Sequence, residues 1–249
     1  MARYDFRTPR LYVDHPLRAG AEIGLDRSQS HYLTGVLRLK TGDSVLAFNG
    51  RDGEWRTRLT QEGRRGALLA AVEQTRTQAP PGDLHYCFAP LKRARLDYMA
   101  QKAVEMGASR LQPVLTRHTQ AERINLDRLR ANAIEAAEQC GILTLPEIGE
   151  PVGLPGWLAA LAPARLLVFC DEEAPVADPV AALGSAAAGP GTPLALLVGP
   201  EGGFAEEERA MLLRHPRLVR LALGPRILRA DTAAVAALAL VQAVLGDWQ

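Results

Sequence analysis

Nearly all-apolar runs that alternate with helical patterns occupy most of the chain after residue 83. The runs LHYCFAPL (84–91), RLLVFCDE (165–172) and PLALLVGP (193–200) have apolar centres. Between such runs, apolar residues recur at helical spacing, as in RARLDYMAQKAVEMGA (93–108) and LDRLRANAIEAAEQCG (126–141). Because strands that are buried on both faces are continuously apolar, this alternation predicts an α/β fold with a mainly parallel sheet covered on both faces.

The remaining elements of this part follow from the same patterns. The last helix, TAAVAALALVQAVL, has no charged residue, so we expect it to be buried all round, in a core or against a second subunit. Asn125 is expected to cap the helix of the stretch 126–141, and Gly141, the last residue of that stretch, is expected just past the end of the helix. Further strands are expected at 110–116 and 218–224, and further helices near 176–187, at 206–215 and at 232–245.

The first 74 residues show short strands and turns instead. The stretch DSVLAFNGRDGEWRTRL (43–59) has two β-rich runs around Asn49-Gly50 and Asp52-Gly53, which indicates a hairpin. One helix, SQSHYLTGVLRL (28–39), is expected to place Leu33, Val36 and Leu37 on one face. The Pro80-Pro81-Gly82 stretch interrupts both periodicities. We therefore predict a small β-barrel or sandwich over 1–74 and a second domain over 75–249.

Composition limits the class of protein. Hydrophobic residues make up 47% and charged residues 23%, and no apolar run is long enough to cross a membrane. The N-terminus has no continuous apolar segment of the kind found in signal peptides. Cys87, Cys140 and Cys170 are widely spaced within apolar segments, which predicts reduced core thiols in a cytoplasmic protein. No clustered Cys/His pattern is present, so we expect no metal.

Charge is divided unevenly along the chain. Residues 1–130 contain 22 Lys and Arg against 14 Asp and Glu, whereas residues 131–249 contain 7 against 14. The N-terminal half is therefore the part that would attract a polyanion, although such asymmetry is also an ordinary property of solvated surfaces.

Two strands end in loops with glycine and proline, LLVGPEGGF and LALGPRILRADTAA. Ligands of open α/β sheets bind beyond the carboxyl ends of strands, so these loops are expected to lie side by side around one pocket. The structural alternative is that Gly199 and Gly224 form tight turns and that Asp231 and Thr232 cap a helix. The acidic run Glu206–Glu208 suits the first turn of a helix and argues against a phosphate there.

Several common catalytic motifs are missing. The chain has no dinucleotide-binding G-x-G-x-x-G after a first strand, no P-loop and no G-x-S-x-G elbow. No Ser-His-Asp or Cys-His set is convincing. Among the histidines, His31 lies among basic residues and could contact RNA, whereas His15, His85, His118 and His215 have the pattern of ordinary surface or core residues.

Taken together, these segments resemble the bacterial small-subunit (16S) rRNA uridine N3-methyltransferases. LLVGPEGGFAEEE, LALGPRILRADTAA, EAAEQCG, LKRARLDYMAQKAVEMGASRLQPVLTRHTQ and HYLTGVLRLKTGDSV occur in the order typical of that family, over nearly the whole chain. The resemblance implies an N-terminal PUA-like RNA-binding barrel, a C-terminal SPOUT domain with a deep trefoil knot, and a homodimer. Relative to the family pattern, this chain has Ala205, Asp231 and Ile142 at positions usually occupied by serine, glutamate and arginine.

The resemblance also implies a cofactor, S-adenosylmethionine, held by main chain in the glycine loops without the charge that a phosphate site needs. Carried over by loop position, the cofactor contacts are Leu197, Val198, Gly199, Gly202, Leu223, Gly224, Leu228, Arg229, Thr232 and Ala233.

For the reaction, our hypothesis is that Arg229, alone or together with Arg226, stabilises negative charge on the uracil oxygens. Asp231 or water would accept the N3 proton, and a cap role for Asp231 is the alternative. RNA in the small ribosomal subunit, free or assembled in the 30S particle, would be bound by Arg7, Arg10, His31, Arg38, Lys92, Arg93 and Arg95.

Three other functions are compatible with the sequence. They are a SPOUT enzyme for another rRNA or tRNA site, a non-catalytic RNA-binding protein, and a nucleotide hydrolase that uses the glycine-rich loop for phosphate. The missing lysine and metal-ligand carboxylates count against the hydrolase.

Overall fold

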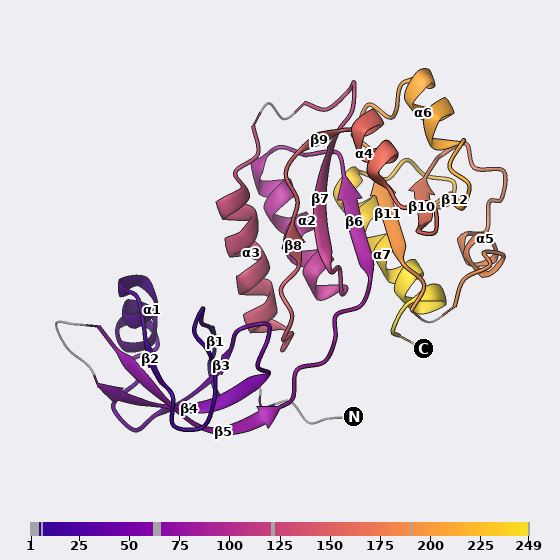
Figure 1. Ribbon diagram of the computed structural model, residues 1–249. Helices are drawn as coiled ribbons and strands as arrows, with labels where there is room; N and C mark the ends of the chain where they lie inside the picture. The colour runs from indigo at the N-terminus through magenta and orange to yellow at the C-terminus, as the bar shows by residue number, and fades with distance from the viewer. Residues whose placement is uncertain (1–4, 6, 62–65, 121–122, 190, 249) are drawn as a thin grey trace. The chain divides into compact units, whose positions relative to one another are not determined.

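The computed structural model describes residues 5, 7–61, 66–120, 123–189 and 191–248 (Figure 1). The chain divides into two compact units, and the division does not follow a single cut. The first unit contains residues 1–80 and also residues 137–145, and the second contains residues 81–136 and 146–249. A segment from the middle of the chain therefore completes the N-terminal unit.

The first unit contains a five-stranded sheet with the order β1-β3-β4-β5-β2. Only the β1–β3 pair is parallel, and the expected hairpin is the antiparallel pair β3–β4. Its core consists of buried aliphatic residues such as Ile23, Leu33, Val45 and Leu69. The strands are β1 (Arg10–Tyr12), β2 (Glu22–Gly24), β3 (Ser44–Phe48), β4 (Glu54–Gln61) and β5 (Leu68–Arg76).

The helix expected over 28–39 is wrong in its second half. It is the short helix α1 (Arg27–His31) followed by a π-helical turn, η1 (Tyr32–Val36). The wider π turn changes the angle between successive side chains, so residues at helical spacing no longer share one face. Leu33 is fully buried, whereas Val36, expected beside it, is 59% exposed.

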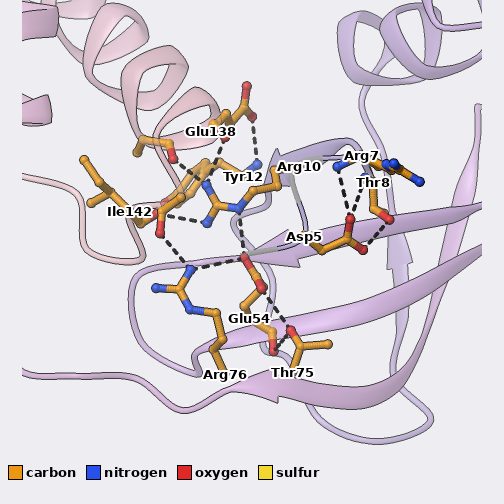
Figure 2. Close-up of polar contacts among 12 residues, drawn as sticks. Asp5, Arg7, Thr8, Arg10, Tyr12, Glu54, Thr75, Arg76, Glu138 and Ile142 are labelled. Carbon is orange, nitrogen blue, oxygen red and sulfur yellow. Dashed lines mark hydrogen bonds and ion pairs between the residues drawn. The ribbon is translucent and has the colours of Figure 1, made fainter. Parts of the chain in front are cut away.

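A buried ion cluster joins β1 to residues 137–145 within the first unit (Figure 2). The Arg10 side chain is 9% exposed and forms an ion pair of 2.8 Å with Glu54. The Arg10 guanidinium also donates to the carbonyls of Ala137, Glu138 and Ile142. Residue 137 begins the last turn of α3 (Leu126–Gln139), so Arg10 supplies donors and positive charge to carbonyls at a helix C-terminus, and the Ala137 carbonyl also accepts the Ile142 amide.

The second unit is built around a parallel sheet with the order β12-β10-β11-β6-β7-β8, and β9 pairs with β7. The predicted α/β class with a parallel sheet is confirmed. The central strand β11 is buried at every position. The strands are β6 (Leu84–Phe88), β7 (Arg110–Leu115), β8 (Glu147–Ile148), β9 (Val152–Gly153), β10 (Leu166–Cys170), β11 (Leu194–Val198) and β12 (Leu218–Leu221).

Helices cover both faces of this sheet. On one face, α4 and α6 bury Trp157 and Leu212 against Phe169 and Leu197. On the other face, α2 packs against α7 and α7 packs on β11, and Figure 1 shows both helices behind the strands. These helices are α2 (Arg93–Glu105), α4 (Leu154–Ala160), α5 (Pro179–Gly184), α6 (Glu206–Leu212) and α7 (Ala230–Leu245).

Two expectations about burial need correction. The last helix, α7, is buried along one face, at Ala234, Leu238 and Val241 among others, and is not buried all round in the single chain. Cys87 is buried, but Cys140 is exposed, because it follows the end of α3 rather than lying on the inner side of that helix. The predicted Asn125 cap is confirmed, since its Oδ1 accepts the Arg128 amide at 2.9 Å.

Candidate functional site

Five loops leave the same edge of the parallel sheet, because the carboxyl ends of parallel strands lie together. In spatial order they follow β12, β10, β11, β6 and β7. The two glycine-proline loops were expected side by side, but β10 lies between β11 and β12. The loops beyond these strands are 222–229, 171–178, 199–205, 89–92 and 116–120, in the same order.

The loop after β11 carries main chain that closely approaches a side chain of its own. A Cβ atom at Gly199 would lie 2.4 Å from Cε2 of Phe204. The Phe204 ring packs edge-on against Phe169 of β10, with 5.1 Å between ring centroids. Gly203 has a φ of +67°, a conformation that side chains other than glycine rarely adopt. Glycines are therefore required here by the conformation of the loop itself.

The cofactor that the resemblance implies, S-adenosylmethionine, is expected to bind about tenfold more weakly when Gly199 is replaced by alanine. The new methyl group must push Phe204 off Phe169, an overpacking cost of about 1–3 kcal/mol that the loop has to absorb. Calorimetric titration with S-adenosylmethionine measures the change. Gly184→Ala is the control, because a Cβ there meets open space. Equal affinity of Gly199→Ala and the native chain would contradict the expectation.

The loop after β12 is open to solvent. Gly224 has a φ of +92°, and the Ile227 side chain is 94% exposed. Arg229 is the N-cap residue of α7 and is exposed, with no capping hydrogen bond from its side chain. Asp231 is half-buried in the first turn of α7, and its Oδ1 accepts the neighbouring Thr232 amide at 3.0 Å. Both candidate catalytic side chains therefore belong to the start of one helix.

The strand between these two loops ends in an ion cluster that sequence reasoning missed. Asp171, 5% exposed, accepts hydrogen bonds from Arg220 at 2.7 Å and from Arg209 at 3.2 Å. Burial by itself raises the pKa of Asp171, but these hydrogen bonds outweigh it and hold the pKa below its ordinary value. The cluster joins the ends of β10 and β12 to α6, and its signal in the sequence was a charged residue directly after an apolar strand.

On its other side, the loop after β11 contacts the first turn of α2 and the loop after β7. Glu201 forms an ion pair with Arg95 of α2. Nδ1 of His118 lies 3.1 Å from the carbonyl oxygens of Gly202 and Gly203. A hollow of about 460 Å³ lies here, lined by Arg117, His118, Thr119, Gln120 and Gly202. The sequence pattern of His118 is that of an ordinary residue, but its place after β7 puts it at the edge of the sheet where ligands bind.

The predicted cofactor residues all lie at or beyond the ends of β11 and β12 or in the first turn of α7. Leu197 and Val198 are buried at the end of β11. The half-buried members are Gly199, Leu223, Leu228 and Ala233, and the exposed members are Gly202, Gly224, Arg229 and Thr232.

The predicted RNA-binding residues divide into two groups. Arg7, His31 and Arg38 are exposed in the first unit, and Lys92 and Arg93 are exposed at the start of α2. Figure 2 shows the Arg7 side chain directed away from the Arg10 cluster. By contrast, Arg10 and Arg95 have carboxylate partners within the protein.

Two further observations bear on the chemistry of this edge. Burial raises the pKa of Cys170 to about 12, so its thiol is not a ready nucleophile. Among the described residues, no group of His, Cys, Asp and Glu has the arrangement of a metal site, and no helix is long and apolar enough to span a membrane.

Comparison with known proteins places this arrangement in a family. A model described as an RNA methyltransferase domain matches residues 77–242, and one described as an RNA methyltransferase PUA domain matches residues 25–71. The ribosomal RNA small subunit methyltransferase E of Rickettsia conorii is 30% identical over 234 residues, which cover 94% of each chain. The chain belongs to the ribosomal RNA small subunit methyltransferase E family. Its relative of that name from Synechocystis is 31% identical and covers 95% of this chain and 78% of the relative.

Solved structures agree with this assignment. The ribosomal RNA small subunit methyltransferase E of Neisseria gonorrhoeae, bound to S-adenosyl methionine, matches with a TM-score of 0.84 and 26% identity over 98% of this chain and 100% of that one. A Legionella pneumophila methyltransferase with bound cofactor SAM matches with a TM-score of 0.83 and 27% identity over 97% and 99%. The expected PUA-like and methyltransferase domains of the methyltransferase E family are thus confirmed, and the trefoil knot stays a prediction.

Proposed function

We propose that this protein transfers a methyl group from S-adenosylmethionine to N3 of a uridine in small-subunit (16S) ribosomal RNA, as a step of ribosome maturation in the cytoplasm. The observation that carries the proposal is the pair of glycine-containing loops beyond β11 and β12, in a chain related over nearly its whole length to enzymes of that name. Two similar solved structures hold the cofactor.

The residues of the edge fit this cofactor. The end of β11 and the glycines after it offer main chain rather than basic side chains, and the loop after β12 adds the half-buried apolar side chains of Leu223 and Leu228. The nearby carboxylates, Glu201 and Glu206–Glu208, would repel a phosphate but not a positively charged sulfonium. We assign the adenosine and methionine parts to main chain at Leu197, Gly199, Gly202 and Gly224 and to the half-buried side chains of Leu223 and Leu228.

The chain's own residues must deal with the acceptor, because uridine N3 carries a proton. When bound, S-adenosylmethionine supplies an electrophilic methyl group on its sulfonium. Arg229 stabilises the negative charge that develops on the uracil oxygens as N3 loses its proton, and Asp231 or water takes that proton. Most of the acceleration comes from holding the acceptor nitrogen in line with the methyl group.

The RNA is gathered by exposed basic side chains. We keep Arg7, His31, Arg38, Lys92 and Arg93 in this role, since each is exposed in its unit. They contact phosphates, while the target base leaves its stack to reach the pocket. Whether free rRNA or the 30S particle is bound is an outcome of the test below.

Binding of RNA is expected to weaken steeply with salt. The three arginines and the lysine of this group predict a slope of log K against log salt of about −3. Arg38→Gln should make the slope less steep by about 0.7–0.9. Fluorescence anisotropy with a labelled rRNA fragment, titrated at several salt concentrations, measures both slopes. Arg18→Gln, an exposed arginine of the same unit outside the footprint, is the control. A flat salt response would remove this footprint.

We further propose that the protein acts as a homodimer through α7. The face of this helix that carries Val235, Ala236, Ala239 and Leu240 is apolar but only half-buried in the single chain. A second copy would cover it.

The function is tested by binding and by product. Calorimetric titration should show binding of S-adenosylmethionine, and methylation of small subunits from cells lacking the activity should give one new N3-methyluridine by mass spectrometry. A different modified nucleotide would keep the enzyme class and change the substrate. Absence of cofactor binding would leave an RNA-binding protein.

A further inference from the structure

The segment Thr116–Gln120, which follows β7, is in direct contact with the main chain of the proposed cofactor loop. Nδ1 of His118 lies 3.1 Å from the carbonyl oxygen of Gly202 and 3.1 Å from that of Gly203. The approach is close at carbon as well, since a Cβ atom at Gly202 would lie 3.3 Å from Cβ of His118. The loop main chain therefore rests directly on this histidine.

These contacts determine which ring nitrogen carries hydrogen. A carbonyl oxygen can only accept, so Nδ1 must be the donor and its N–H is shared between the two carbonyls. In the neutral ring, Nε2 is then left with its lone pair. The donor at Nδ1 is present whether the ring is neutral or protonated.

The segment that carries His118 is itself fixed. The Thr116 amide donates to Thr119 Oγ1 at 2.8 Å, and the Thr119 amide donates to the Thr116 carbonyl at 3.1 Å, which closes a turn. The Arg117 amide donates to one carboxylate oxygen of Glu208 at 2.8 Å, and the Ala205 amide donates to the other at 3.0 Å. Glu208 thus joins the turn to the far end of the glycine-rich loop.

We propose that His118 is a positioning residue for the methyl-transfer reaction. Its Nδ1–H holds the main chain of Gly202 and Gly203, including the left-handed conformation of Gly203, in the form that binds the cofactor. Within the loop the Gly203 amide donates to the Pro200 carbonyl at 3.0 Å, but glycine main chain allows many orientations of the Gly202 and Gly203 carbonyl groups, and the His118 contact fixes these two. This inference rests on the proposed function, since it concerns the same cofactor loop.

Three replacements of His118 distinguish the contributions of its two ring nitrogens, Nδ1 and Nε2. Asparagine can place an amide donor near the position of Nδ1, glutamine places its amide nearer the position of Nε2, and alanine offers neither. His118→Ala and His118→Gln are expected to weaken S-adenosylmethionine binding about 5- to 10-fold, the size of one lost hydrogen bond. His118→Asn is expected to stay within about twofold of the native chain, because it keeps that hydrogen bond. Arg117→Ala is the matched control, since alanine retains the main-chain amide that Glu208 accepts.

The measurements are calorimetric cofactor affinity, kcat and KM on small subunits, and thermal midpoint. Rescue of affinity by asparagine but not by glutamine supports the positioning role. If the three variants bind S-adenosylmethionine with the same affinity as one another, while the native chain binds it, the positioning role is overturned. A His118→Asn variant that binds the cofactor normally but loses kcat as far as His118→Ala also overturns it and assigns His118 to the acceptor. Failure of the native chain to bind the cofactor would instead refute the proposed function.

Discussion

Replacement of Arg229 by alanine is expected to lower kcat by about 10²–10³ while cofactor affinity changes little, because removal of one group that stabilises developing charge costs about this much. The side chain is exposed and makes no capping hydrogen bond at the start of α7, so its loss should not disturb folding. Single-turnover methylation of small subunits, alongside calorimetric titration with S-adenosylmethionine, measures the two quantities separately.

Two variants sharpen this result. Arg229→Lys keeps the positive charge but loses the planar pair of donors, so it should recover only part of kcat. Arg226→Ala, in the same exposed loop, decides which of the two arginines acts on the uracil oxygens. Native-like turnover in Arg229→Ala would remove this residue from the mechanism. Loss of turnover in Arg226→Ala alone would transfer the role to Arg226.

The layers of the second unit could be predicted from the sequence because its strands are buried on both faces. Every residue of Leu194–Val198 is buried, and only an apolar run satisfies that environment. The strands β8 and β9, of two residues each, are too short to show any period. The helix α4 was missed because its few residues, with proline and glycine among them, give no helical pattern.

The two glycine-proline loops of the site could be predicted from the sequence, whereas the contacts made by neighbouring strands could not, because these depend on the order of strands in the sheet. Periodicity identifies strands but not their neighbours, so the position of β10 between β11 and β12 could not be derived. For the same reason the Asp171 cluster and the contact of His118 with Gly202 were missed, although both follow strand ends. Applying the carboxyl-edge rule to every strand of the sheet would have selected both residues.

The sequence also gives no indication that residues 137–145 belong to the first unit, because their place there depends on one side chain that is distant in sequence. Arg10 is separated by more than 120 residues from the carbonyls that it caps. In the sequence it is one arginine among many in a basic N-terminal half, which predicts a contact with RNA. Its burial beside Glu54 is a tertiary property that charge counting does not reveal.

Replacement of Arg10 by alanine is expected to destabilise the first unit by about 3–5 kcal/mol, the usual cost of removing one partner from a buried ion pair. Glu54, 3% exposed, would keep, among the described contacts, the longer one of 3.6 Å with Arg76 and the hydroxyl of Thr75 at 3.0 Å. The carbonyls of Ala137 and Glu138 at the end of α3 would lose the Arg10 donor as well, while that of Ala137 would keep the Ile142 amide. Native-state hydrogen exchange of the β3, β4 and β5 amides reports this unit separately from the rest of the chain.

Matched variants distinguish the causes of that loss. Burial lowers the pKa of Arg10, and the neighbouring Glu54 carboxylate opposes this shift. The guanidinium nevertheless stays charged at any working pH, so deprotonation of Arg10 at high pH should not reproduce the loss of stability seen in Arg10→Ala. Adding Glu54→Gln to Arg10→Ala removes the uncompensated carboxylate and should recover part of the stability. Arg10→Lys keeps a charge beside Glu54 but cannot reach both the carboxylate and the helix carbonyls, so it should fall between the native chain and alanine. A loss below about 1 kcal/mol in Arg10→Ala, the value of a surface pair, would show that the cluster contributes little to the first unit.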